Sequence, residues 1–260
     1  MNYWQAVALG LVQGLTEFLP VSSSGHLVLA EALTAVKMPG IFVEVALHVA
    51  TLGSVLIVYG KRLWQVFWGA IRGRPGEFRM ALLLLIATIP AGVIGYFFNH
   101  AIEQLFHSLV FVGVFFIVTG FVLWSTRGRS GEAQQPTIGG AVAIGVAQAV
   151  AILPGISRSG STVSAGLWAR LAPVAAAEFS FLMAVPVIAG AAVLEGHHAT
   201  VNLVQVGVGP FVVSLLVAFA SGIFAIRFLV ALLRRGRFFA FAPYCGAVGA
   251  LTIVYALWRG

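Results

Sequence analysis

The sequence predicts an all-α polytopic membrane protein with six transmembrane helices and two re-entrant helix hairpins in an inverted-topology repeat. Three observations predict this fold. The chain is 60% hydrophobic and 9% charged, with a mean hydropathy of +1.00, which is typical of membrane proteins rather than soluble domains. Several apolar stretches are long enough to span a bilayer. Two further apolar segments are interrupted near Pro20 and Pro154 by serine- and glycine-rich sequence.

The length and charge of the chain set its organisation. With 260 residues, it has room for one integral membrane domain, 1–260, and none for a separate soluble domain. The net charge of +7 comes mostly from basic residues between apolar segments, so we expect no nucleic acid partner. The first residues, Met1 to Trp4, lack the basic character of a signal peptide, and we expect no cleaved leader.

The transmembrane helices are expected where apolar residues run for about 20 positions, the length that crosses the hydrocarbon core. Cys245 falls in the last of these stretches, and as the single cysteine it can form no intramolecular disulfide. The six expected spans are about 41–59, 80–98, 109–126, 175–194, 210–232 and 240–258.

The two re-entrant hairpins are expected at 3–34 and 138–170. Each begins apolar, breaks into polar residues at a proline and then turns apolar again. A helix, a polar break and a second helix are typical of a segment that enters the membrane and leaves on the same side. A pair of kinked spanning helices is the alternative.

The basic residues predict which connections face the cytoplasm. Two connections, 99–108 and 195–209, contain no lysine or arginine and are expected outside, together with both termini. This topology is self-consistent only if both hairpins are re-entrant, the first entering from outside and the second from the cytoplasm. Arg259 would then lie outside, against the rule. The connections expected in the cytoplasm are 60–79, 127–137 and 233–239.

The chain repeats itself at an offset of 135 residues. Three spans separate the two hairpins, and this odd number gives the two halves opposite orientations. We therefore expect repeat 1 over about 3–126 and repeat 2 over about 138–258, with the two polar breaks meeting near the midplane. Five identities support the repeat: Gly10, Gln13, Ser22, Ser24 and Gly25 match Gly145, Gln148, Ser157, Ser159 and Gly160.

The first break, QGLTEFLPVSSSGH at 13–26, contains residues suited to phosphate-ester cleavage. Glu17 is a carboxylate near membrane depth, so it requires a metal ion, an arginine or a proton as a partner. As a metal ligand it suits Mg²⁺ or Ca²⁺. Ser23 is the predicted nucleophile, because its counterpart in the repeat is Arg158 rather than a serine. His26 is predicted to take a proton from that serine or give one to a leaving group.

The second break, PGISRSGST at 154–162, is typical of an anion site. Arg158 has a permanent charge and a planar fork that matches phosphate oxygens, and its alternative role is a stabilising pair with Glu17 or Glu178. For the serines, backbone capping at the helix breaks is the alternative role. His48 is expected to be a packed residue. The groups predicted to bind substrate phosphate are Ser22, Ser24, Ser157, Ser159, Gly160, Thr162 and Gln13.

Three segments, 17–26, 154–162 and 177–186, resemble the undecaprenyl pyrophosphate phosphatases of the bacitracin-resistance type. The resemblance covers essentially the whole chain. It implies a multi-pass enzyme of the bacterial inner membrane that removes the terminal phosphate from the C55 isoprenoid pyrophosphate and recycles this lipid carrier for cell-wall synthesis. It also implies a requirement for a divalent cation, a site accessible from the periplasm, and the same arrangement of six spans and two hairpins.

The resembled family has Glu or Gln followed four residues later by Glu, and here the pair is Gln13 and Glu17. Glu17 is therefore the only acid of the pair. The expected mechanism has Arg158 and hydroxyls holding phosphate and Glu17 holding the cation. Ser23, assisted by His26, attacks phosphorus before water hydrolyses the phosphoserine. Direct attack by water is the alternative.

Two rival functions follow from the same residues. A transporter or flippase of the monophosphate lipid would also use an inverted repeat with broken helices. An acid phosphatase of the soluble type would need a histidine and an aspartate after Arg158, and no such pair follows it. The expected partners are the isoprenoid pyrophosphate lipid and the bilayer. The oligomeric state is left open, with a homodimer as one option.

Overall fold

The computed structural model describes residues 1–34, 41–196 and 206–259. In these ranges the chain is helical and contains no strand, only an isolated bridge between Ala133 and Leu171. The helices are α1 (Tyr3–Phe18), α2 (Ser23–Thr34), α3 (Ile41–Ile71), α4 (Pro75–Phe106), α5 (Leu109–Trp124), α6 (Ile138–Val150), α7 (Arg158–Trp168), α8 (Pro173–Gly196), α10 (Val208–Arg234), the 3₁₀ helix η1 (Phe238–Phe241) and α11 (Ala242–Arg259).

The six expected spans correspond to α3, α4, α5, α8, α10 and the η1–α11 segment. Five helical segments of the described chain are long and apolar enough to cross a membrane on their own. The sixth span is α5, which qualifies only together with the last turns of α4, from which it is bent by 94°. The all-helical, multi-pass fold is therefore confirmed.

Two connections are shorter than the sequence predicted. α3 continues to Ile71, so only 72–74 of the expected connection 60–79 is not helical, and α4 takes up most of 99–108. Charged residues do not end a helix, whereas Gly73 at φ +68° stops α3, and Pro75 favours a new start as the first residue of α4. Of the expected connection 195–209, most lies outside the described residues.

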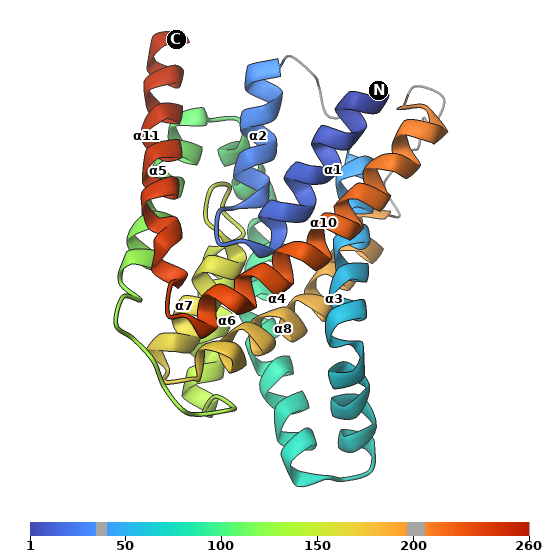
Figure 1. The fold of residues 1–260 in the computed structure, drawn as a ribbon, viewed down its shortest axis with the longest axis vertical. Helices are drawn as coiled ribbons and strands as arrows, with labels where there is room; N and C mark the ends of the chain where they lie inside the picture. The colour runs from blue at the N-terminus through green and yellow to red at the C-terminus, as the bar shows by residue number, and fades with distance from the viewer. Residues whose placement is uncertain (35–40, 197–205, 260) are drawn as a thin grey trace.

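The two predicted hairpins approach the middle of the molecule from opposite ends (Figure 1). α1 descends from the end that holds both chain termini, and α2 returns toward that end. The turn between α6 and α7 reaches the middle from the other end, where α3 joins α4. This is the arrangement that an inverted repeat predicts. How deeply each hairpin enters a bilayer stays a prediction.

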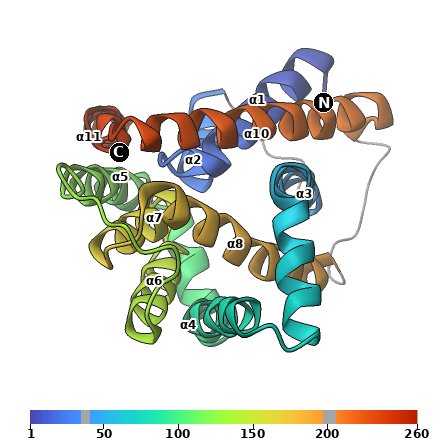
Figure 2. The same cartoon turned by 60° about the horizontal axis from the view of Figure 1, so that its bottom comes forward.

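The two repeats are interlocked rather than side by side. α1 packs along α10 of the second repeat, and α6 packs along α4 of the first, on opposite sides of α7 and α8 (Figure 2). Glycine permits both close approaches: a Cβ at Gly10 would lie 2.5 Å from the Ser214 carbonyl oxygen, and one at Gly145 would lie 2.5 Å from that of Ala87. The matched glycines of the repeat therefore mark equivalent helix contacts.

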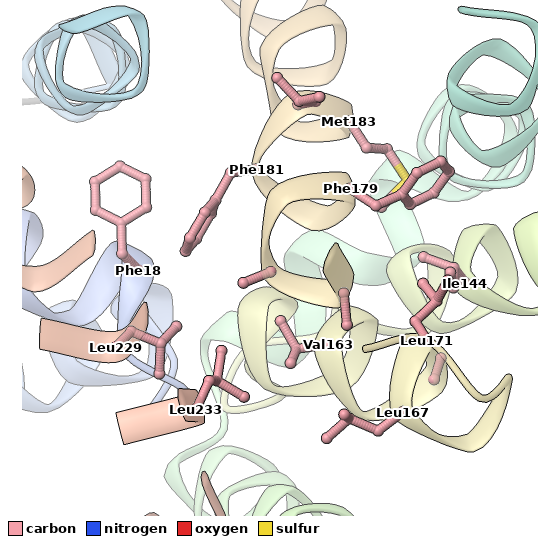
Figure 3. Close-up of a cluster of buried hydrophobic side chains, with 14 of the residues drawn as sticks. Phe18, Ile144, Val163, Leu167, Leu171, Phe179, Phe181, Met183, Leu229 and Leu233 are labelled. Carbon is pink, nitrogen blue, oxygen red and sulfur yellow. The ribbon is translucent and has the colours of Figure 1, made fainter. Parts of the chain in front are cut away.

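The main apolar core lies where α1, α6, α7, α8 and α10 meet (Figure 3). Phe18, the last residue of α1, packs edge-on against Phe181 of α8 with ring centroids 5.6 Å apart. Leu229 and Val163 bring α10 and α7 into the same cluster. Because Phe18 directly follows Glu17, this core fixes the end of α1 from which the first polar break begins.

Candidate active site

The first break is a tight turn built on Ser22. This residue adopts φ +66°, a left-handed conformation that costs a non-glycine residue roughly 1–3 kcal/mol. Its hydroxyl oxygen accepts the backbone N–H of Gly25 at 3.3 Å, so Ser22 caps the start of α2. The turn leaves Ser23 as the first residue of α2, with its side chain directed back toward α1.

The second break repeats this capping geometry. Ser157 accepts the N–H of Gly160 at 3.1 Å and begins α7, just as Ser22 begins α2. The paired hydroxyls also match, with Ser22 and Ser24 3.4 Å apart and Ser157 and Ser159 3.3 Å apart. The alternative role of capping is confirmed for Ser22 and Ser157.

The buried carboxylate of Glu17 is the centre of the site, since its side chain is only 4% exposed. Oε1 accepts Nη2 of Arg158 at 2.7 Å. Oε2 accepts the hydroxyl of Ser23 at 2.7 Å and the amide Nε2 of Gln13 at 3.1 Å. The partner that the sequence required for this acid is therefore an arginine from the other hairpin, and the predicted nucleophile donates to the same carboxylate.

The tips of the two hairpins are in direct contact around this ion pair. Ser159 donates to the backbone carbonyl of Leu19 at 3.0 Å, which ties α7 to the first break. A Cβ on Gly25 would lie 3.0 Å from the Cα of Gly155. Within the described residues, Arg158 hydrogen bonds through Nη2 alone, so its other guanidinium nitrogens are free to bind an anion.

His26 takes part in a separate arrangement at the first turn of α2. Its Nδ1 lies 2.7 Å from the carbonyl of Ser22, and its Nε2 lies 2.7 Å from the hydroxyl of Tyr244 on α11. A carbonyl only accepts, so Nδ1 donates to Ser22 and the neutral ring accepts from Tyr244 at Nε2. The hydroxyl of Ser23 donates to Glu17 instead. The role predicted for His26 in moving the Ser23 proton stays a prediction.

Two residues at the site were not singled out by the sequence. His48 of α3, expected as a packed residue, places Nε2 3.5 Å from Oε2 of Glu17 and holds the backbone oxygen of Glu44 with Nδ1. Tyr244 contacts His26 across more than 200 residues of sequence. Neither lies in a polar motif, and only the three-dimensional packing of α3 and α11 against the first hairpin brings them in.

The hydroxyls predicted to bind phosphate all have protein partners. Thr162 donates to the Arg158 carbonyl or pairs with Ser180 at 2.6 Å, and Ser159 is bonded to Leu19. Ser22 and Ser157 are caps, as described above, and Ser24 contacts Ser22. Gln13 differs, since its Oε1 is a buried acceptor with no hydrogen-bond partner among the residues that the structure describes. Phosphate binding by this group of residues stays a prediction.

The family model described as bacitracin resistance protein BacA matches residues 6–251. The chain belongs to the BacA family. Among its relatives, the undecaprenyl-diphosphatase of Desulfatibacillum aliphaticivorans is 39% identical over 98% of this chain and 99% of its own length. Those of Thermomicrobium roseum and Carboxydothermus hydrogenoformans are 41% and 40% identical, over 98% of this chain and 98% and 97% of theirs. The resemblance predicted from the three polar segments is confirmed over nearly the whole chain.

Proposed function

We propose that this BacA family member hydrolyses undecaprenyl diphosphate to undecaprenyl phosphate and inorganic phosphate, and so recycles the lipid carrier for cell-wall synthesis. Its relatives are named for this activity over almost their full length. One observation of the site supports it most. The Glu17 carboxylate holds the hydroxyl of Ser23 and the guanidinium of Arg158 at 2.7 Å each, which joins a nucleophile, a base and a phosphate clamp.

In the first step, Ser23 Oγ attacks the terminal phosphorus and its proton passes to Glu17. The new O–P bond forms as the bond from that phosphorus to the bridging oxygen breaks. Undecaprenyl phosphate leaves with the bridging oxygen and receives the proton from Glu17. The free nitrogens of Arg158 hold the phosphate oxygens as charge develops on them.

In the second step, Glu17 accepts a proton from water, and the water oxygen attacks phosphorus as the bond from phosphorus to Ser23 Oγ breaks. Inorganic phosphate is released, and Glu17 returns the proton to Ser23 Oγ, which restores the serine. Direct attack by water on the diphosphate, oriented by Ser23 and Glu17, is the alternative route. A divalent cation, Mg²⁺ or Ca²⁺, is part of the proposal. Glu17 and the unpartnered Oε1 of Gln13 are hard oxygen donors that would hold it. Such a cation would neutralise negative charge on the diphosphate.

The site is proposed to open toward the end of the molecule that holds both termini, the periplasmic side of the bacterial inner membrane. Two connections expected on that side, 99–108 and 195–209, lack lysine and arginine, which supports this orientation, whereas Lys37 and Arg259 do not follow the rule. The isoprenoid tail is then proposed to lie in the bilayer against the apolar outer faces of the helices. A homodimer stays a prediction.

The test is phosphate release from farnesyl or undecaprenyl diphosphate by protein purified in detergent, with EDTA and after addition of Mg²⁺ or Ca²⁺. Arg158→Ala should lose nearly all release. Arg170→Ala is the matched control, because it removes an exposed arginine at the end of the same hairpin, beyond α7. Release that needs no divalent cation would overturn the metal part of the proposal and leave the hydrolysis intact.

Two further outcomes separate the alternatives. Absence of release under every cation, with binding of the monophosphate lipid retained, would favour the flippase, which the named relatives do not support. Rapid quenching during turnover, followed by mass spectrometry, should find phosphate on a peptide containing Ser23. Its absence under conditions of full turnover would favour direct attack by water.

A further inference from the structure

Arg227 is a charged residue inside an apolar span. It lies in α10, whose 208–234 segment has a mean hydropathy of 2.4, and its side chain is exposed. In the described part of the chain it makes no hydrogen bond and no ion pair. A guanidinium in a transmembrane segment is costly unless it is paired or lies in a polar cavity. The fold therefore leaves this arginine without the partner that its position requires.

Arg227 lines a cavity of about 450 Å³ between α3, α8 and α10. Arg234 lines the same cavity two helical turns further along α10, about 10 Å away at 1.5 Å per residue. The opposite wall includes Val58 and Tyr59 of α3. The volume falls in the range of ligand pockets, and the wall is apolar apart from a few polar groups.

The charges that face this cavity do not cancel. Among the described residues, Glu178 of α8 is the one acid that lines it, and its Oε1 already accepts Nε of Arg62 at 2.9 Å. Arg62 is bonded to both Glu178 and Glu77, so with Arg227 and Arg234 three positive charges stand against two carboxylates. The excess of one positive charge matches one phosphodiester. The cavity lies toward the end of α10 that leads into the basic connection 233–239, where anionic head groups gather in the inner leaflet.

We propose that this cavity binds the head group of an anionic phospholipid. The phosphodiester lies between Arg227 and Arg234, the hydroxyl of Tyr59 is a further donor, and the acyl chains follow the valines of the wall. The phosphate of the lipid is then the negatively charged partner of Arg227. This site is distinct from the Glu17 centre and does not depend on the hydrolytic activity.

The test is lipid retention, measured by native mass spectrometry of protein released from detergent after equilibration with dioleoyl phosphatidylglycerol or dioleoyl phosphatidylcholine. The wild type should retain phosphatidylglycerol in preference to phosphatidylcholine. Arg227→Gln with Arg234→Gln should weaken phosphatidylglycerol binding roughly 10-fold or more, since hydrogen bonds to charged groups are the stronger ones. The Lys/Lys double variant keeps the charges and should keep most of the binding.

The matched control is Arg235→Gln with Arg237→Gln, which removes two exposed arginines just beyond the cavity. Its phosphatidylglycerol binding should stay within about twofold of the wild type. The affinity for this lipid is set by the one excess positive charge at the cavity and not by the net charge of the protein. Equal losses in both Gln/Gln pairs would overturn the proposal in favour of general attraction to the basic end. Farnesyl phosphate is the competitor. If it displaces phosphatidylglycerol at a lower concentration than phosphatidylglycerol itself needs to bind, the proposal is overturned in favour of an isoprenoid phosphate site.

Discussion

The two hairpins share one framework. Each begins its second helix with a capping serine, Ser22 or Ser157, that accepts the N–H of a glycine three residues later. Each pairs that serine with another two residues later, and each packs a matched glycine of its first helix against the other repeat. Gly10 and Gly145 are these glycines. The symmetric positions therefore build the turn and its packing.

The hairpins differ at the two residues of the ion pair and at Ser23, whereas Gln13, which also contacts Glu17, has a matched residue in Gln148. At the offset of 135, Glu17 corresponds to Ile152 and Ser23 to Arg158. Glu17 and Arg158, one from each hairpin, bond to each other across the contact between the tips. The proposed nucleophile, base and phosphate clamp are thus positions that break the symmetry, whereas the repeated serines and glycines supply the scaffold, and Gln13 is the repeated position proposed to hold the cation.

The largest effect is expected from breaking this asymmetric pair. Glu17→Gln should reduce phosphate release roughly 10³- to 10⁴-fold, because the base of Ser23 is lost together with the counter-charge of Arg158. Removing one member of a buried ion pair also destabilises a protein by roughly 3–5 kcal/mol, whereas removing both is often close to neutral. Glu17→Gln with Arg158→Gln should therefore unfold at a higher temperature than either single variant, while staying inactive.

The measurements for this cycle are phosphate release and thermal unfolding in detergent. Glu103→Gln is the control, since its carboxylate is 61% exposed and its removal should change neither quantity. A double variant whose instability equals the sum of the two single losses would mean that the two residues do not interact in the folded protein.

The second prediction compares two adjacent serines. Ser23 has no serine counterpart in the second repeat, whereas Ser24 is matched by Ser159. Ser23→Ala should reduce release roughly 10²- to 10³-fold, because the hydroxyl of Ser23, unlike that of Ser24, donates to Glu17. Ser24→Ala should stay within a few fold, because its hydroxyl pairs with Ser22 in the repeated framework. Steady-state phosphate release under saturating substrate measures both. Equal losses in the two variants would remove the distinction between scaffold and chemistry.

The sequence predicted the scaffold well for a physical reason. Spans follow from apolar length, and the repeat follows from identities at one offset, so α3, α4, α8 and α10 and both breaks could be placed from residues alone. The pairing of Arg158 with Glu17 could be stated only as one alternative, because contact between residues 141 apart depends on how the repeats interlock. His48 and Tyr244 come from helices outside the motifs, where no local pattern indicates a site.

The third prediction concerns Tyr244, which has no motif of its own. Tyr244→Phe should lower release about 3- to 10-fold, the effect of one hydrogen bond, because it frees Nε2 of His26. Tyr255→Phe is the matched control on the same helix, since its hydroxyl bonds to the Ala32 carbonyl at 3.2 Å and should matter little for release. If the tyrosine acts through His26, then His26→Ala should lose no more activity when Tyr244→Phe is added. Additive losses would assign the two residues independent roles.

The smallest expected effect is that of substituting the capping serines, which are repeated in the two hairpins. Ser22→Ala and Ser157→Ala should each lower the free energy of unfolding by about 1 kcal/mol, the usual cost of losing a helix cap. Ser130→Ala, in an exposed connection, is the control and should change nothing.

Denaturation in detergent measures the stability, and KM for farnesyl diphosphate measures phosphate binding. A cap lost from either hairpin should cost the same stability and leave KM within about twofold. A rise in KM without loss of stability would instead assign that serine to the substrate, and a rise confined to one hairpin would extend the asymmetry to the capping positions.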